Sequence, residues 1–211
     1  MSNGANLTQN DNLPKEVRDY YDKGIAAVKR ENYGYAVELL SAALALKQDF
    51  AEARYFLWFA LWERQKKLPD PLKIRAVFAR IAALFPTLKG LSLQKRGKTW
   101  EAIYQLEKAM KLDPGNTKTL NAIAGCLLIE GQTFNAIKIL EGIPLIDKKS
   151  YKTLAKLGQL YKSVDNYDKA RAYYEATLRV NPGDIEAERA IKDLDALKTL
   201  KGSFTNPQQN K

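Results

Sequence analysis

The sequence predicts an all-α fold in which antiparallel helix pairs stack into a solenoid. Apolar residues recur at helical spacing along most of the chain, and turn-forming residues interrupt that pattern at intervals. One helix–turn–helix unit of 34 residues, Tyr151–Asp184, reappears in altered form elsewhere in the chain. Two helices of about 14 residues cannot bury their own apolar faces, so each pair needs stacked neighbours.

The unit Tyr151–Asp184 shows the pattern most clearly. Gly158 lies inside the apolar face of its first helix, which predicts close approach by a neighbouring helix. Asp165-Asn166 forms the turn. In the second helix Ala170 is small where the two helices should cross, and Asn181-Pro182-Gly183 ends the helix.

This unit resembles the tetratricopeptide repeat (TPR) family. The residues that carry the resemblance, at the family's spacing, are Leu157-Gly158, Tyr161, Tyr167, Ala170, Tyr174 and Pro182. The resemblance is specific at 17–50 and 117–184, partial at 97–116 and poor at 51–96. It implies a right-handed α-solenoid that has no catalytic activity and binds peptides or extended partner segments in a concave groove, lined by the first helix of each repeat.

We expect a solenoid domain at 14–201 between two disordered tails, at 1–13 and 202–211. The predicted repeats are 17–50, 51–86, 87–116, 117–150 and 151–184. A helix at 185–200, apolar on one face and charged on the other, is predicted to cap the last repeat. Pro144 should shorten or kink the second helix of the fourth repeat.

The second repeat departs most from the pattern. Its first helix, 51–67, contains the run YFLWFALW at 55–62 and is apolar on every side. The segment Leu68-Pro69-Asp70-Pro71 then interrupts the helical pattern. A second helix, at about 72–84, is predicted to end at Phe85-Pro86. Ten residues remain for the next helix, unless Pro86 lies in its first turn. How the helices pair across 68–96 stays open.

Composition excludes several classes of function. The chain has no histidine and one cysteine, Cys126, so an internal disulfide and a structural zinc site are excluded. No Ser or Cys has a plausible base, and Gly97-Lys98-Thr99 lacks the glycine and the preceding strand of a phosphate-binding loop. We therefore predict an interhelical turn at 97–99, and neither catalytic residues, metal nor cofactor. Without a signal peptide or a run of ~18 apolar residues, the predicted location is cytoplasmic.

The groove implied by the resemblance would be aromatic near its amino-terminal end and basic near its carboxyl-terminal end. Its candidate lining residues are Tyr21, Tyr55, Phe59, Trp62, Lys118, Asn121, Lys152 and Gln159. Such a surface suits a protein or peptide with apolar anchors and acidic residues or a free carboxylate. The aromatic residues at 55–62 could equally fill the core. Lys152 and Lys156 fall near two positions of the carboxylate clamp of chaperone-binding members, but the Asn positions do not match, so no clamp is predicted.

The positive charge is concentrated in the middle of the chain. Residues 65–112 carry 11 Lys/Arg and 3 Asp/Glu, whereas the whole chain has a formal charge of +10. The candidate basic patch consists of Lys66, Lys67, Lys73, Arg75, Arg80, Lys95, Arg96 and Lys98. It predicts, as an alternative function, binding of nucleic acid or another polyanion through 65–112. A solvated surface explains the same charges, and neither the partner nor the oligomeric state can be read from the sequence.

Overall fold

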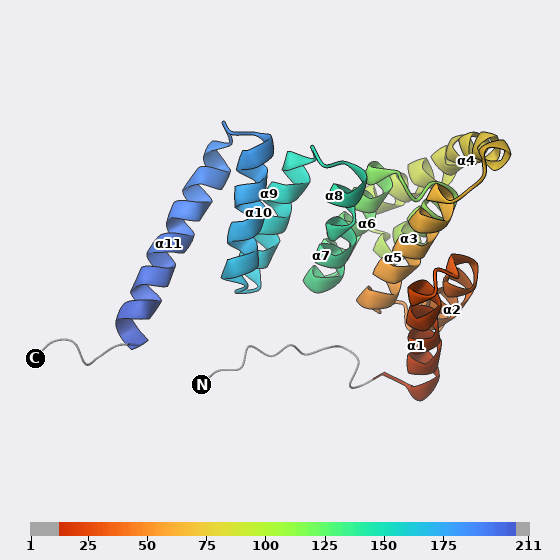
Figure 1. Cartoon of the computed structure of the whole chain (residues 1–211), viewed down its shortest axis with the longest axis horizontal. Helices are drawn as coiled ribbons and strands as arrows, with labels where there is room; N and C mark the ends of the chain where they lie inside the picture. The colour runs from red at the N-terminus through yellow and green to blue at the C-terminus, as the bar shows by residue number, and fades with distance from the viewer. Residues whose placement is uncertain (1–12, 206–211) are drawn as a thin grey trace, which may run out of the picture. The chain divides into compact units, whose positions relative to one another are not determined.

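The computed structural model describes residues 13–205, without the side chains of 70–76 and 198–205, and every regular element in that range is a helix. The chain forms two compact units, unit 1 (Met1–Gly142) and unit 2 (Ile143–Lys211) (Figure 1). Antiparallel helix pairs recur in both units, which confirms the predicted all-α class. Over the described residues no helix is long and apolar enough to span a bilayer.

Unit 1 begins with a helix pair, α1 (Lys15–Lys29) and α2 (Tyr33–Leu46). Glu31 takes a left-handed φ of 57° in the turn between them, and the Asn32 side chain caps α2 by accepting from the Tyr35 amide. Gly24 allows the two helices to approach, because a Cβ there would lie 2.8 Å from Leu40 Cγ. The side chain of Leu13 is buried, so the predicted tail at 1–13 ends earlier, and residues 1–12 lie outside the description.

The aromatic helix α3 (Ala51–Lys66) packs against α2 and α7 (Thr133–Glu141). Trp58 is fully buried and donates its indole N–H to the Pro114 carbonyl at 2.9 Å. Its ring leaves no room for a side chain at Gly142, where a Cβ would lie 2.6 Å from Trp58 Cζ3. Trp62 covers Gly115 in the same way. Two glycines therefore make space for the two tryptophans of this helix.

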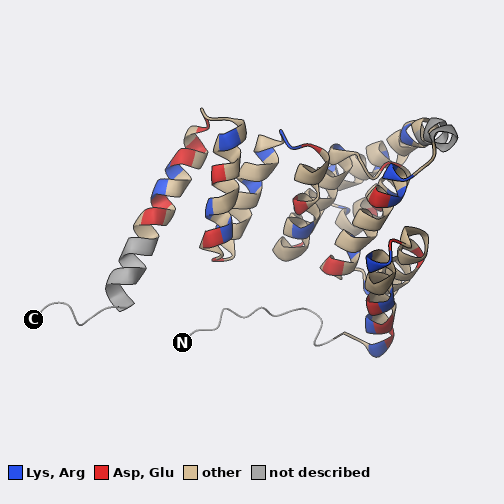
Figure 2. Cartoon of the chain, in the orientation of Figure 1, with Lys and Arg blue, Asp and Glu red and all other residues tan. Residues whose placement is uncertain are grey.

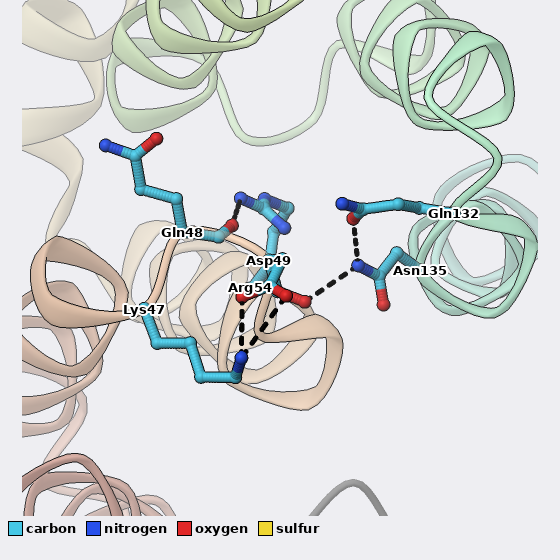
Figure 3. Close-up of polar contacts among 6 residues, drawn as sticks. All are labelled: Lys47, Gln48, Asp49, Arg54, Gln132 and Asn135. Atoms are coloured by element: carbon cyan, nitrogen blue, oxygen red, sulfur yellow. Dashed lines mark hydrogen bonds and ion pairs between the residues drawn. The ribbon is translucent and has the colours of Figure 1, made fainter. Parts of the chain in front are cut away.

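A polar network fixes the start of α3 against α7 (Figure 3). The Asn135 side-chain amide donates to the Asp49 carbonyl at 2.8 Å, which ties the α2–α3 loop to α7. Arg54 is 2% exposed, pairs with Glu107 at 2.7 Å and also donates to the Gln48 carbonyl. A buried guanidinium needs such partners because its desolvation is costly.

The next helix, α4 (Asp70–Lys95), is 26 residues long and continues through Pro86. The prediction that a helix ends at Phe85-Pro86 is therefore wrong. Proline removes one backbone hydrogen bond from a helix interior. Packing on both sides of Pro86 compensates for this lost bond, because Ala83, Pro86 and Gly90 are all buried. The Thr87 hydroxyl also donates to the Ala83 carbonyl at 2.7 Å. The open pairing question is also answered, since α4 packs along α5 (Thr99–Leu112).

The remaining helices of unit 1 follow the predicted pattern more closely. Gly97, with φ 74°, makes the turn between α4 and α5, so the predicted turn is present at Gly97 and Lys98, whereas Thr99 already begins α5. After α5 come α6 (Thr117–Ile129) and α7, separated by a turn in which Gly131 has φ 71°. Cys126 is buried within α6, and burial raises the pKa of its thiol to about 11. The predicted effect of Pro144 is confirmed, because α7 ends at Glu141.

Unit 2 contains the short helix α8 (Ile143–Ile146), the pair α9 (Tyr151–Ser163) and α10 (Tyr167–Val180), and α11 (Ile185–Thr205). The predicted close approach at Gly158 is confirmed, since a Cβ there would lie 2.9 Å from the Tyr174 ring. The helix α11 packs against α10. It continues to Thr205 because Gly202 does not end it, so the predicted disordered tail at 202–211 is wrong for its first four residues, 202–205, and 206–211 lie outside the description.

Candidate functional site

Unit 2 contains an open cleft of about 700 Å³ beside α9. One wall is the outer face of α9 and the other is formed by the start of α11. The residues that line it are Tyr151, Lys152, Ala155, Lys156, Gln159, Lys162, Ser163, Tyr174, Asp184, Glu186 and Ala187. The cleft is thus built where the first helix of the last repeat faces the capping helix.

Helical spacing explains why α9 presents these side chains on one face. Leu154, Leu157 and Gly158 face the partner helix and are buried. The intervening positions, three or four residues apart, therefore project from the opposite side of the helix. Lys152 and Gln159 are exposed there, so the structure brings these two sequence-predicted residues into one cleft.

The α9 wall is positively charged. Lys162 forms an ion pair with Asp193 at 3.5 Å. Among the described residues no carboxylate pairs with Lys152 or Lys156, so these two ammonium groups are available to a ligand. They stand four residues apart on one face, which brings both charges to the same side of the cleft. An extended anionic segment is the ligand that such a wall favours.

The floor and the second wall are different in character. Burial raises the pKa of the Tyr174 phenol above its ordinary value, and the nearby carboxylates of Asp193 and Glu186 add to the rise, so this phenol stays neutral. Asp184 accepts from the Ala187 amide at 3.0 Å and so caps the start of α11. Glu186 is exposed on the first turn of α11. The cleft therefore has a basic wall and an acidic edge, which would orient a bound segment.

Sequence reasoning missed the contribution of α11 to this cleft. Glu186 is absent from the predicted groove because the helix at 185–200 is expected only to cover the last repeat, and Asp184 is absent because it lies in the turn before that helix. The helix α11 stands where the first helix of a following repeat would stand, after the turn at Pro182. That position in the repeat order was the signal that could have placed its first turn in the groove.

The aromatic residues predicted at the other end of the groove pack within unit 1. The prediction that Tyr21 lines the groove is wrong, because its side chain is buried in the core with its ring centroid 4.7 Å from that of Phe50. Tyr55 and Phe59 are half-buried and their rings stack at 6.5 Å, while Trp62 lies against Gly115. Burial raises the pKa of the Tyr55 phenol, and Glu141 adds to the rise. The sequence left open whether the aromatic residues at 55–62 line the groove or fill the core, and these contacts favour core packing.

The two predicted groove residues of α6 lie on the surface of unit 1. Lys118 is exposed, and the half-buried Asn121 donates its side-chain amide to the Thr117 carbonyl at 2.9 Å. They belong to a different unit from Lys152 and Gln159. Within unit 2 the structure brings Lys152 and Gln159 together, and Lys118 and Asn121 are described only within unit 1.

Ion pairs neutralise much of the candidate basic patch. Lys66 pairs with Glu63, Lys98 with Glu101 and Arg80 with Asp113, at 2.7, 3.0 and 3.6 Å. Lys67 pairs with Glu31, which raises the pKa of Lys67 and lowers that of Glu31. Lys95 and Arg96 are exposed at the end of α4, and the side chains of Lys73 and Arg75 lie outside the description. Figure 2 shows acidic and basic residues interspersed over much of the chain.

Comparison with curated proteins finds two longer relatives, of which one is named a TPR repeat-containing protein. The chain is 32% identical over 110 residues to a TPR repeat-containing protein of Methanocaldococcus jannaschii, a match that covers 51% of this chain and 34% of that protein. It is 32% identical over 97 residues to anaphase-promoting complex subunit 7 of Arabidopsis thaliana, covering 46% and 17%. The matches thus span 34% and 17% of the length of these relatives. No family model matches it.

Solved structures with the same fold are TPR domains. The first TPR domain of Spaghetti (RPAP3), bound to the HSP90 peptide SRMEEVD, has a TM-score of 0.50 and 22% identity, covering 56% of this chain and 93% of that one. The Sgt2 TPR domain from Aspergillus fumigatus has a TM-score of 0.51 and 20% identity, covering 62% and 87%. The repeat pattern and these structures show that the chain has the fold of tetratricopeptide repeat domains.

Proposed function

We propose that this chain is a non-catalytic interaction scaffold that binds an extended, acidic protein segment in the cleft between α9 and α11. The observation that carries the proposal is the pair of ammonium groups at Lys152 and Lys156, which have no carboxylate partner in the described structure and line a cleft of about 700 Å³. A carboxylate side chain or a free carboxyl terminus is the ligand that satisfies them.

The shape of the site supports a peptide rather than a compact small molecule. The cleft follows the exposed face of α9 from Tyr151 to Ser163, a helix of 13 residues. At 1.5 Å per residue that face is about 20 Å long, the length of about six extended residues. The RPAP3 domain, which shares the fold, is seen with a seven-residue peptide, so a fold of this kind can hold such a segment.

A preformed cleft would allow the scaffold to bind its partner without catalysing a reaction. Helices α9 and α10 are already packed through Gly158 and Tyr174, so little of the site has to be ordered on binding. Acidic residues of the partner would lie along the α9 wall. Basic or polar residues would lie near Asp184 and Glu186 at the opposite edge, which sets the direction of the bound segment.

The test is selection of random heptapeptides displayed on phage against the full chain, followed by fluorescence titration of one enriched peptide. We expect enrichment of Asp and Glu, and binding at least about tenfold weaker to the Lys152→Glu/Lys156→Glu variant. The matched control is Arg179→Glu, an exposed charge reversal on α10 outside the cleft, which should leave affinity unchanged. Selected peptides without acidic bias, or equal binding by the double variant, would refute the proposal.

A further inference from the structure

The helix α4 carries an uncovered row of large apolar side chains. Six of its residues are each more than half exposed, reaching 73% for Phe85. The row consists of Val77, Phe78, Ile81, Leu84, Phe85 and Leu88. We call it the α4 ridge. Its exposed area amounts to several hundred Å², more than one face of a monomeric protein ordinarily leaves in contact with water.

Helical geometry places the whole ridge on one side of α4. At 100° per residue, the six side chains fall within an arc of roughly 120°. The opposite side is the buried one: Ala83 and Gly90 pack toward α5, and a Cβ on Gly90 would lie 2.6 Å from Leu106 Cγ. The packing of unit 1 thus uses the small residues of α4 and turns the large ones outward.

The surroundings of the α4 ridge are basic. No Asp or Glu occurs from residue 71 to residue 100 of the sequence. Arg80 and Lys89 border the ridge on opposite sides, and Lys95 and Arg96 follow at its carboxyl-terminal end, all of them exposed. Arg80 pairs with Asp113 at 3.6 Å, and its side chain is still 57% exposed, so it remains in contact with solvent beside the ridge.

The shape and the charge together select the occupant. The residues stand out as a convex ridge, whereas a partner helix docks best into a groove. Pairing with the same face of a second copy would bring the basic borders together. An anionic lipid surface needs no complementary shape, accepts an arc of this width, and attracts basic residues on both borders at once.

We propose that the α4 ridge is a membrane-surface binding site that inserts its apolar side chains among anionic lipid headgroups. Phe78, Phe85 and the aliphatic residues between them would lie at the boundary of headgroups and acyl chains, with Arg80 and Lys89 at the level of the phosphates. The site lies in unit 1 and is independent of the α9–α11 cleft in unit 2. It would bring a peptide-binding scaffold to a membrane surface without a spanning segment.

The test is flotation of the full chain with vesicles of phosphatidylcholine alone and with vesicles of phosphatidylcholine and phosphatidylglycerol in equal parts. We expect the chain to float with the anionic vesicles and much less with the neutral ones. The variant Ile81→Ser/Phe85→Ser should lose at least about tenfold in partitioning, and Lys89→Glu should lose roughly fivefold, with stronger loss at low salt.

Matched controls distinguish binding by the α4 ridge from nonspecific adsorption to vesicles and from misfolding. Phe134→Ser removes a phenylalanine that is 64% exposed on α7, and Lys23→Glu reverses an exposed charge on α1. Both should float like the unaltered chain, and helical circular dichroism should be the same for all variants. Failure to float with anionic vesicles overturns the proposal. So does a dimer in light scattering that disappears in Ile81→Ser/Phe85→Ser while flotation persists, since the ridge would then bind a second copy.

Discussion

The α9–α10 pair and the α3–α4 region belong to the same repeat pattern, but their helices pack against different kinds of neighbour. In α9–α10 a glycine of one helix meets a tyrosine of its partner, Gly158 against Tyr174, and the contact stays within the repeat. In α3 the large residue is Trp58, and it meets Gly142 at the end of α7, well beyond its own repeat. The same device of large against small residues therefore gives a local pair in one region and a distant contact in the other.

This difference explains where the unusual surfaces of the molecule arise. Over the residues that the structure describes, α3 packs on α2 and α7 and does not form a close pair with α4. The helix α4 then packs along α5 through its small residues, and its large apolar residues remain uncovered. A regular repeat leaves only its groove open, whereas the exchange of partners in unit 1 creates a second exposed surface.

The largest expected effect comes from breaking the distant contact. Trp58→Ala should lower the free energy of unfolding of unit 1 by about 4 kcal/mol, because it opens a cavity and leaves the Pro114 carbonyl without its donor. Tryptophan fluorescence in urea measures unit 1 alone, since all three tryptophans lie there. Trp100→Ala, at a residue 37% exposed, is the control and should cost less than about 1 kcal/mol. Equal losses would mean that Trp58 does not hold α3 in place.

A smaller effect is expected from the buried charge beside the same contact. Arg54→Met should destabilise unit 1 by about 3 kcal/mol, because Glu107 loses the partner that offsets its partial burial. The double variant Arg54→Met/Glu107→Leu removes both charges and should recover a substantial part of that loss, again by urea unfolding. If the double variant is as unstable as the two single losses added together, the ion pair is not the reason for the effect of Arg54.

The smallest effect tests the local contact of the regular repeat. Gly158→Ala should destabilise α9 by about 1 kcal/mol, since the new Cβ would lie 2.9 Å from the Tyr174 ring and overpacking outweighs the gain in helix propensity. Gly125→Ala on α6 is the matched change, because its Cβ would meet only the flexible end of Gln94, at 3.0 Å. Amide hydrogen exchange should show faster exchange in α9 for the first and unchanged or slower exchange in α6 for the second. The reverse order would contradict the contact at Gly158.

The sequence could predict whatever depends on local pattern. The turn at Asn166, the small residue Gly158 and the shortening at Pro144 all act on neighbours within one repeat. Pro86 misled the prediction because proline usually ends a helix, and here packing of Ala83 and Gly90 against α5 keeps the helix continuous. Tertiary contact outweighed a local preference that is about 3 kcal/mol in an isolated helix.

The sequence could predict which residues share a surface where the repeat is regular. Lys152 and Gln159 lie together in the cleft because the spacing on α9 is that of an undistorted helix. Tyr21 was misplaced because helical spacing alone does not tell which apolar face meets a neighbour, and Phe50 fills the space beside it. The acidic edge of the cleft depends on how α11 stacks on α10, which no single repeat specifies.

The contacts of α3 also bear on how the chain acquires its structure. The bond from Trp58 to Pro114 joins residues 56 positions apart, and the bond from Asn135 to Asp49 joins residues 86 positions apart. Repeat proteins ordinarily fold by adding one unit to the next, with short loops to close. Here α3 and the loop before it cannot complete their packing until α7 has left the ribosome, so unit 1 should fold as one cooperative block once α7 is available.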